Sequence, residues 1–225
     1  MPPPPSDNIL AALPPELSQG LFAKARVSAL AADQMLFLTG DAGDGCYRVE
    51  EGLLKASVVA PAGGERILAI LGPGALVGEL SMIDGVPRSA SVAALRPSKL
   101  SFISRASFDA YGREHPDLYR HVMTLLARRL RETNGALAAT SFLPLKGRVA
   151  RALMSLAEAF GNDVGGGRIL IRQKVTQSDL AAMAGIAREN VSRILKEWTD
   201  DKLVSRLAGY YCLENKKAIE REASL

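Results

Sequence analysis

The stretch from Val27 to Ser104 constrains the fold more than any other part of this chain. Short apolar runs alternate there with glycine-rich turns: MLFL, CYRV, LLKASVV, RILAIL, SVAAL and KLSFI. Many short strands with regular turn signals are typical of an antiparallel roll or barrel, whose mouth is a natural ligand pocket. We therefore predict a β-roll, preceded by short helical pieces over residues 8–25 and by a disordered, proline-rich leader over residues 1–8.

One segment, GELSMIDGVPRSA (residues 78–90), interrupts this pattern with a helical turn. Gly78 lets the backbone approach a ligand, while Arg88 and Ser89 offer donors suited to phosphate oxygens. Glu79 would repel a phosphate, but it can accept a hydrogen bond from a sugar hydroxyl. A single ligand with a ribose hydroxyl and a phosphate would use both groups. A surface turn carrying a Glu–Arg ion pair is the alternative.

The net charge of +4 is unevenly distributed along the chain. Residues 1–144 hold fourteen Lys/Arg and fourteen Asp/Glu, whereas residues 145–225 hold fourteen Lys/Arg and ten Asp/Glu. A basic C-terminal part suggests a polyanion partner, and a solvated basic surface is the alternative.

Several functional classes lack their sequence signals. Cys46 and Cys212 form no metal or redox pattern, and no apolar run approaches the roughly 20 residues that span a membrane. The start MPPPPS lacks the features of a signal peptide. No paired nucleophile and base appears. We therefore expect a cytoplasmic protein that is not an enzyme and has neither a metal nor a membrane partner.

The longest helical signal follows the roll. A short helix is expected over residues 107–113, and a long one runs from Asp117 to about Phe142. Its apolar and small polar residues recur at alternating spacings of four and three: Tyr119, Met123, Leu126, Leu130, Thr133, Leu137 and Thr140. This heptad seam predicts a coiled-coil homodimer. A surface helix packed on its own domain is the alternative.

The last part of the chain predicts a helix-turn-helix. Pro144 ends the long helix, and an amphipathic helix over residues 145–160, a flexible loop over 161–167 and a strand over 168–172 follow. Thr176 to Asp179 resembles a capping box. The helix-turn-helix spacing is carried by Ala181, Gly185, Val191 and Ile194, and residues 203–206 and 210–213 predict a wing. An ordinary helical hairpin is the alternative.

Two segments carry a resemblance to a known family. GELSMIDGVPRSASVAA and ARENVSRILKEW resemble the phosphate-binding cassette and the recognition helix of the Crp/Fnr superfamily of bacterial transcription regulators. The resemblance implies that Glu79 binds the ribose 2′-hydroxyl of cyclic AMP and that Arg88 and Ser89 bind its phosphate. Backbone groups of Gly78, Leu80 and Ala90 would contribute, and Leu71 would pack on the base.

The same resemblance places Thr133 at the adenine and Asn134 where the partner subunit reaches in. Asn134 departs from the serine of the best-known cyclic-AMP receptor, and Asn both donates and accepts, so cyclic GMP also stays possible.

In the recognition helix, Arg188, Glu189 and Arg193 match the pattern that reads TGTGA-like half-sites, and Glu189, Ser192 and Arg193 satisfy a TTGAT-like one. We favour the TGTGA-like site. The expected DNA contacts are Thr176, Gln177, Arg188, Glu189, Ser192, Arg193 and Lys196. Ala187 stands where a hydroxyl N-cap is usual, which costs about 1 kcal/mol.

We thus expect an α+β chain with a sensor roll (residues 9–115), a dimerisation helix (116–143) and a winged helix-turn-helix (145–225). It would act on palindromic double-stranded DNA as a cyclic-AMP-responsive homodimer and contact RNA polymerase. Two alternatives change the sensor: another effector (haem, an iron–sulfur cluster or a redox thiol), or no ligand at all. A further one is a signalling subunit that binds cyclic nucleotide without binding DNA.

Overall fold

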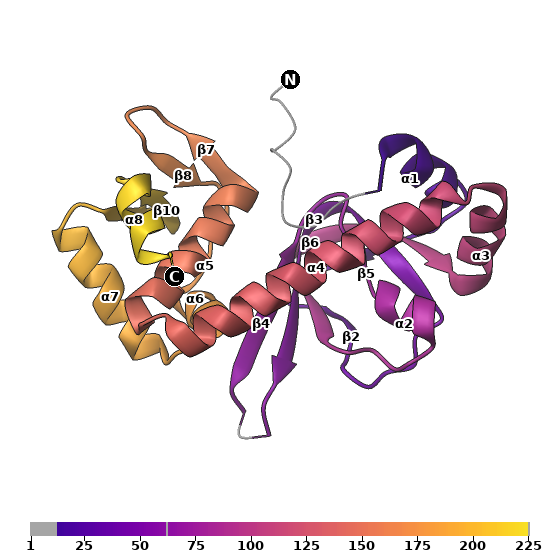
Figure 1. The fold of residues 1–225 in the computed structure, drawn as a ribbon, viewed down its shortest axis with the longest axis horizontal. Helices are drawn as coiled ribbons and strands as arrows, with labels where there is room; N and C mark the ends of the chain where they lie inside the picture. The colour runs from indigo at the N-terminus through magenta and orange to yellow at the C-terminus, as the bar shows by residue number, and fades with distance from the viewer. Residues whose placement is uncertain (1–12, 62, 225) are drawn as a thin grey trace. The chain divides into compact units, whose positions relative to one another are not determined.

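The computed structural model describes residues 13–61 and 63–224, and the chain divides between Glu132 and Thr133 into two compact units (Figure 1). The leader that we expected over residues 1–8, and Leu10 of the first helical piece, lie outside the described residues.

The first unit is a β-roll. It begins with helix α1 (Pro15–Phe22), in which Pro15 occupies a first-turn position that needs no N–H donor. The strands are β1 (Arg26–Leu30), β2 (Met35–Phe37), β3 (Gly45–Val59), β4 (Glu65–Leu71), β5 (Leu76–Val77) and β6 (Ser91–Ser104). All are paired antiparallel in the order β1-β6-β3-β4, with β2 also on β6 and β5 also on β3.

The roll is confirmed, but two of its strands, β3 and β6, are longer than predicted because each contains two of the apolar runs. CYRV and LLKASVV are both parts of β3, and SVAAL and KLSFI are both parts of β6. Gly52 is the reason: its φ of +93° forms an irregularity inside β3 and not a turn between two strands. A Cβ there would collide with Ser98, whose Oγ accepts from the Leu53 N–H at 3.0 Å.

Two apolar clusters hold this unit together. One fills the roll and includes Val49, Leu54, Leu71 and Leu100. The other lies between the roll and four helices: α1, α2 (Glu79–Asp84), α3 (Arg105–Glu114) and α4 (Asp117–Phe142). Leu118, Val122 and Leu125 are the α4 members of this second cluster.

Helix α4 has the length that the sequence predicted, and it uses two of its faces differently. Leu118, Val122 and Leu125 are buried, whereas the expected heptad seam lies largely open. Met123 is 62% exposed, Leu130 61% and Leu137 68%. The seam is therefore offset from the face that packs on the chain's own roll, and Leu126 is the seam residue that also packs against this second cluster.

The second unit contains α5 (Leu145–Phe160), β7 (Gly161–Asp163), β8 (Ile169–Ile171), α6 (Gln177–Ala184), α7 (Arg188–Asp200), β9 (Val204–Leu207), β10 (Tyr210–Leu213) and α8 (Lys216–Glu222). The strands pair in the order β7-β8-β10-β9. One apolar cluster joins α5, α6 and α7 to these strands, with Trp198 and Tyr211 as its largest fully buried side chains.

Two expectations for this unit need correction. We expected residues 161–167 to form a loop, but Gly161 to Asp163 pair with β8, so the turn is confined to the residues after Asp163. Gly165, Gly166 and Gly167 all have positive φ there. We also missed α8, which Asn215 caps by accepting a hydrogen bond from the Ala218 N–H at 3.1 Å.

Candidate functional site: the cassette and the recognition helix

The segment from Gly78 to Ala90, called the cassette below, begins with a short helix bracketed by two glycines. Helix α2 (Glu79–Asp84) starts after Gly78 and ends at Gly85, whose φ values are +80° and +78°. Residues other than glycine rarely adopt this left-handed backbone conformation. The two glycines therefore let the chain turn sharply at both ends of α2. The Gly85 N–H donates to the Ser81 carbonyl and closes the helix.

Arg88 is nearly fully buried, with 5% of its surface exposed. Nη1 donates to the Gly78 carbonyl at 2.6 Å and Nη2 to the Gly45 carbonyl at 2.9 Å. The guanidinium also lies 4.4 Å from the centre of the Phe37 ring. Its Nε is buried and has no partner among the described residues. A Cβ at Gly78 would collide with this guanidinium, which explains why that position needs glycine for space as well as for φ.

Glu79 is also buried, at 3% exposed. It forms an ion pair with Arg129 on α4, and Arg129 Nη2 donates in addition to the Leu76 carbonyl at 2.6 Å. Arg129 was not among the site residues predicted from the sequence. A signal existed: Arg129 follows Leu118, Val122 and Leu125 at spacings of four, three and four, so it belongs to the face that packs on the roll.

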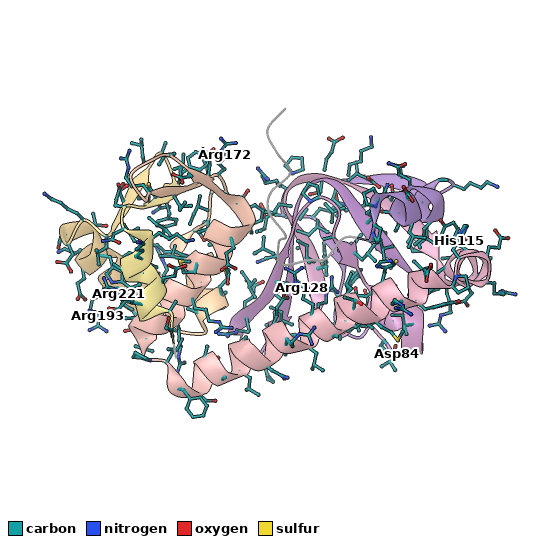
Figure 2. The ribbon with its side chains drawn as sticks, turned by 45° about the horizontal axis from the view of Figure 1, so that its top comes forward. Asp84, His115, Arg128, Arg172, Arg193 and Arg221 are labelled. Atoms are coloured by element: carbon teal, nitrogen blue, oxygen red, sulfur yellow. The ribbon has the colours of Figure 1, made fainter. Side chains whose placement is uncertain are left out.

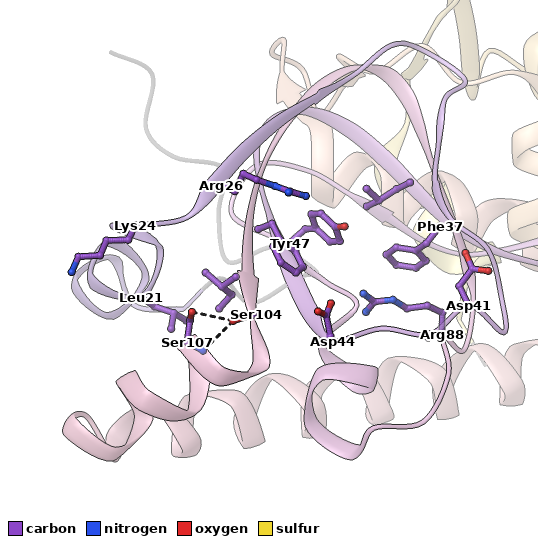
Figure 3. Close-up of a pocket in the computed structure, with 14 residues that line it drawn as sticks. Leu21, Lys24, Arg26, Phe37, Asp41, Asp44, Tyr47, Arg88, Ser104 and Ser107 are labelled. Carbon is purple, nitrogen blue, oxygen red and sulfur yellow. Dashed lines mark hydrogen bonds between the residues drawn. The ribbon is translucent and has the colours of Figure 1, made fainter.

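A cavity of about 670 Å³ opens beside Arg88 (Figure 3). Its lining combines three aromatic rings (Phe37, Tyr47 and Phe102) with charged groups of both signs (Lys24, Arg26, Arg88, Asp41 and Asp44). Tyr47 and Phe102 lie 5.0 Å apart, centre to centre, across paired strands. Of the expected ligand-binding residues only Arg88 lines this cavity.

The remaining expected ligand-binding residues are spread more widely. Leu71 is 3% exposed and belongs to the core of the roll. Leu80 is 42% exposed, Ser89 is exposed and Ala90 is half-buried. Thr133 and Asn134 are exposed on α4 and belong to the second unit.

The helix-turn-helix forms as its local signals predict. Thr176 accepts from the Asp179 N–H at 3.0 Å while Asp179 accepts from the Thr176 N–H, which completes the capping box at the start of α6. Gly185 ends α6 at a φ of +65°. Val191, Ile194 and Trp198 bury one face of α7, and Ala187 makes no side-chain cap.

The opposite face of α7 is open to solvent. Arg188, Glu189, Ser192, Arg193 and Lys196 are all exposed. Figure 2 labels Arg193, whose Nη2 donates to Asn190 Oδ1 at 3.1 Å. The expected DNA-contacting residues of this helix therefore share one exposed surface. Thr176 and Gln177 lie at the N-terminus of α6, and β9 and β10 form the wing.

Two negative findings apply to the described part of the chain. No described helix is long and apolar enough to cross a membrane. Residues 13–61 and 63–224 hold no group of three or more His, Cys, Asp or Glu side chains placed to bind a metal ion.

Comparison with known proteins agrees with this architecture. The cyclic nucleotide-binding domain family matches residues 27–115, and the Crp-like helix-turn-helix domain family matches residues 147–222. The class of protein is thus a DNA-binding transcription regulator with a cyclic nucleotide-binding domain.

Relatives and solved structures agree with this class. The chain is 34% identical to a CRP-like cAMP-activated global transcriptional regulator of Mycobacterium tuberculosis, over 72% of each chain. It is 37% identical to a cyclic AMP receptor protein of Thermus thermophilus, over 75% of this chain and 74% of the relative. The structure of the c-di-GMP-responsive global regulator CLP of Xanthomonas campestris has the same fold, with a TM-score of 0.75 and 21% identity over 88% and 98% of the two chains. The chain belongs to the Crp/Fnr family.

Proposed function

We propose that this regulator responds to a cyclic nucleotide, with cyclic AMP as the first candidate. The observation that carries the proposal is the pair of oppositely charged, buried side chains in one cassette, Glu79 and Arg88. Glu79 would accept from the ribose 2′-hydroxyl, while Arg88 and Ser89 would bind the phosphate. Backbone groups of Gly78, Leu80 and Ala90 would complete the site.

The donors of Arg88 fit a phosphate. A guanidinium has five N–H donors, and the described hydrogen bonds to Gly78 and Gly45 use two of them. The buried Nε has no partner among the described residues. A phosphate would therefore find donors without displacing the carbonyls that hold Arg88. Charge-assisted hydrogen bonds of this kind are among the strong ones.

The Glu79–Arg129 ion pair supports a link between the cassette and α4. Because Arg129 holds Glu79, any ligand that bonds to Glu79 also acts on the helix that carries the heptad seam. We propose that two chains pair through residues 116–143 and that ligand binding shifts the balance between two arrangements of the dimer. Leu71, Thr133 and Asn134 would select the base.

The proposed DNA site is a palindrome of TGTGA-like half-sites. Arg188 and Arg193 would bind guanine in the major groove, and Glu189 would accept from cytosine N4. Thr176, Gln177, Ser192 and Lys196 would add further contacts. In a homodimer the two recognition helices would read half-sites about 34 Å apart. The proposal includes a contact with RNA polymerase and a cytoplasmic location.

The second candidate is a regulator of the same kind that responds to another effector or to none. The observation that favours it is that both charged groups of the cassette already have protein partners: Arg129 for Glu79, and two carbonyls for Arg88. The Xanthomonas regulator of the same fold is described as c-di-GMP-responsive.

Calorimetric titration with cyclic AMP, cyclic GMP and c-di-GMP distinguishes these candidates. We expect cyclic AMP to bind the wild type, and Arg88→Leu to weaken binding at least about 100-fold because several charge-assisted hydrogen bonds are lost. Arg96→Leu, at an exposed position of β6, is the matched control and should bind normally. Binding of cyclic AMP that is equal in both variants would contradict the proposed site. Binding of c-di-GMP alone, or of none of the three, would favour the second candidate.

A further inference from the structure

The C-terminal end of the cassette helix α2 is held by a residue outside the cassette. Arg105 is the first residue of α3, and its Nη2 donates to the Ser81 carbonyl at 2.6 Å. The Ser81 carbonyl also accepts a hydrogen bond from the Gly85 N–H at 3.0 Å. The guanidinium of Arg105 lies close to Gly85: a Cβ at Gly85 would be 3.3 Å from both of its terminal nitrogens.

This contact suits the electrostatics of the helix end. Carbonyls near a helix C-terminus carry partial negative charge, and the Ser81 oxygen can accept a second hydrogen bond beside the one from Gly85, so a nearby cation stabilises this end of α2. Helix α2 is only one or two turns long, and isolated helices of that length do not persist in water. It therefore depends on outside partners. Arg105 is such a partner at the C-terminal end of α2. Near the N-terminal end, Arg129 forms an ion pair with Glu79 and donates to the Leu76 carbonyl.

The backbone of Arg105 is fixed by the segment that leads into β3. Its N–H donates to the Asp44 carbonyl at 2.6 Å, and the adjacent carbonyl, that of Gly45, accepts from Arg88. Ser104 caps α3 by accepting from the Ser107 N–H at 3.2 Å, which sets the direction in which Arg105 leaves the strand. One residue thus joins the end of α2 to the segment that holds Arg88.

We propose that Arg105 is a positioning residue of the effector site. It fixes the end of α2 and the turn at Gly85, and in this way it sets the position of the segment from Val86 to Ser89 that delivers Arg88. The effect on ligand affinity rests on the proposed function. The effect on the ligand-free cassette does not, so the two can fail separately.

The test compares Arg105→Gln, Arg105→Lys and Arg113→Gln. Arg113 lies on the same helix, is exposed, and donates only within α3 to the Asp109 carbonyl among its described contacts, so it is the matched control. Hydrogen exchange of ligand-free protein is measured at the amides of Met82 and Gly85, whose hydrogen bonds close α2. Amides of β3 and β6 serve as the internal reference, and calorimetry with cyclic AMP is run on the same samples.

We expect Arg105→Gln to speed exchange at Met82 and Gly85 about tenfold or more, with the strand amides unchanged, and to weaken cyclic AMP binding about tenfold. Arg105→Lys should restore most of both, and Arg113→Gln should change neither. Unchanged α2 exchange in Arg105→Gln would overturn the proposal, and so would faster exchange throughout the roll, which indicates general destabilisation. If the wild type binds no cyclic AMP, the proposed effector fails, and the exchange at α2 alone decides the role of Arg105.

Discussion

Glu79 and Arg129 are fifty residues apart in the chain, and their ion pair joins the cassette to the helix α4. The Glu79 side chain is 4% exposed and that of Arg129 is 24% exposed, so the pair is largely removed from water. Removing one partner of such a pair leaves a buried charge without compensation, which costs far more than the pair itself contributes.

Arg129→Gln should therefore lower the free energy of unfolding of the first unit by about 3–5 kcal/mol. The double variant Glu79→Gln/Arg129→Gln should lose less than the sum of the two single variants, because no buried charge remains. Urea unfolding followed by circular dichroism measures this cycle. Arg128→Gln is the control: Arg128 (labelled in Figure 2) pairs with Glu132 at the surface, and its loss should cost about 0.5 kcal/mol or less. Additive single effects would show that the two charges do not interact.

The heptad seam on α4 predicts that a charge there prevents dimerisation. Leu130→Asp places a carboxylate in the proposed dimer core, and sedimentation velocity should show a shift from dimer to monomer. Thr124→Asp introduces the same charge at an exposed position of α4 outside the seam, and it should remain dimeric. A dimeric Leu130→Asp protein would place the interface elsewhere.

The exposed face of α7 predicts how DNA affinity changes. Arg193→Ala should weaken binding to a palindrome of TGTGA half-sites about 10- to 100-fold, since a bidentate contact with guanine contributes about 1–3 kcal/mol. Glu189→Ala should instead reduce discrimination at a single base pair. Fluorescence anisotropy against matched and single-substituted sites measures both effects. Arg113→Gln removes one positive charge from the sensor unit and should bind as the wild type does. Equal losses on specific and random DNA would assign Arg193 to phosphate contacts.

The missing cap of α7 predicts a stabilising substitution. Ala187 has extended backbone angles (φ −67°, ψ 145°) that suit an N-cap, but its side chain cannot accept a hydrogen bond. Ala187→Ser should raise the free energy of unfolding of the second unit by about 0.5–1 kcal/mol. Thr176→Ala removes the existing cap of α6 and should lower it by about 1 kcal/mol. Trp198 is 2% exposed on α7, so its fluorescence in urea reports both changes. A neutral or destabilising serine would mean that the hydroxyl does not reach the α7 amides.

Burial of Cys46 predicts a pH dependence. Desolvation raises the pKa of its thiol from 9.0 to about 12, with the Glu79 carboxylate contributing and Arg88 and Arg129 opposing. The folded state therefore favours the neutral thiol. Its contribution to stability is complete below pH 9, and it declines by up to about 1.4 kcal/mol per pH unit as the pH rises from 9 toward 12.

Two measurements check this expectation. The loss of stability between pH 8 and pH 10.5 should be smaller in Cys46→Ala than in the wild type. A thiol reagent at pH 8 should label Cys212, which is half-buried, and leave Cys46 unmodified until urea unfolds the roll. Rapid labelling of Cys46 in the folded protein would contradict its burial.

The sequence predicted those features that local chemistry determines. Hydrophobic periodicity, together with the Gly, Pro and capping residues at the ends of elements, located the roll, α4, the capping box and the wing. The length of β3 was not predictable because a glycine such as Gly52 usually indicates a turn. Only the pairing of β3 with β6 on both sides of Gly52 shows that one strand continues past it. Residues 161–163 look like part of a loop for the same reason, since pairing with β8 makes them a strand.

For the site, the cassette residues were recognisable, and of their partners only Arg129 had a signal in the sequence, its place on the α4 face that packs on the roll. Gly78 and Gly45 bind Arg88 through backbone carbonyls, which a sequence does not distinguish, and only the fold brings these carbonyls to Arg88. Arg105 and Arg129 lie outside the motif, and their contacts with the Ser81 and Leu76 carbonyls are set by the packing of α3 and α4 on the roll.

The two left-handed glycines that bracket α2 also define how this site can vary by mutation. A side chain at Gly78 or Gly85 would need a positive φ and would also meet the guanidinium of Arg88 or Arg105, so both positions strongly favour glycine. Leu80, Ile83 and Val86 between and beside them are exposed and free of these constraints. In a saturation library, tolerance should therefore be low at the two glycines and at the buried Glu79, Ser81 and Met82, and high at Leu80, Ile83 and Val86. Variants with altered effector preference would then arise by changing these exposed positions and keeping the glycines.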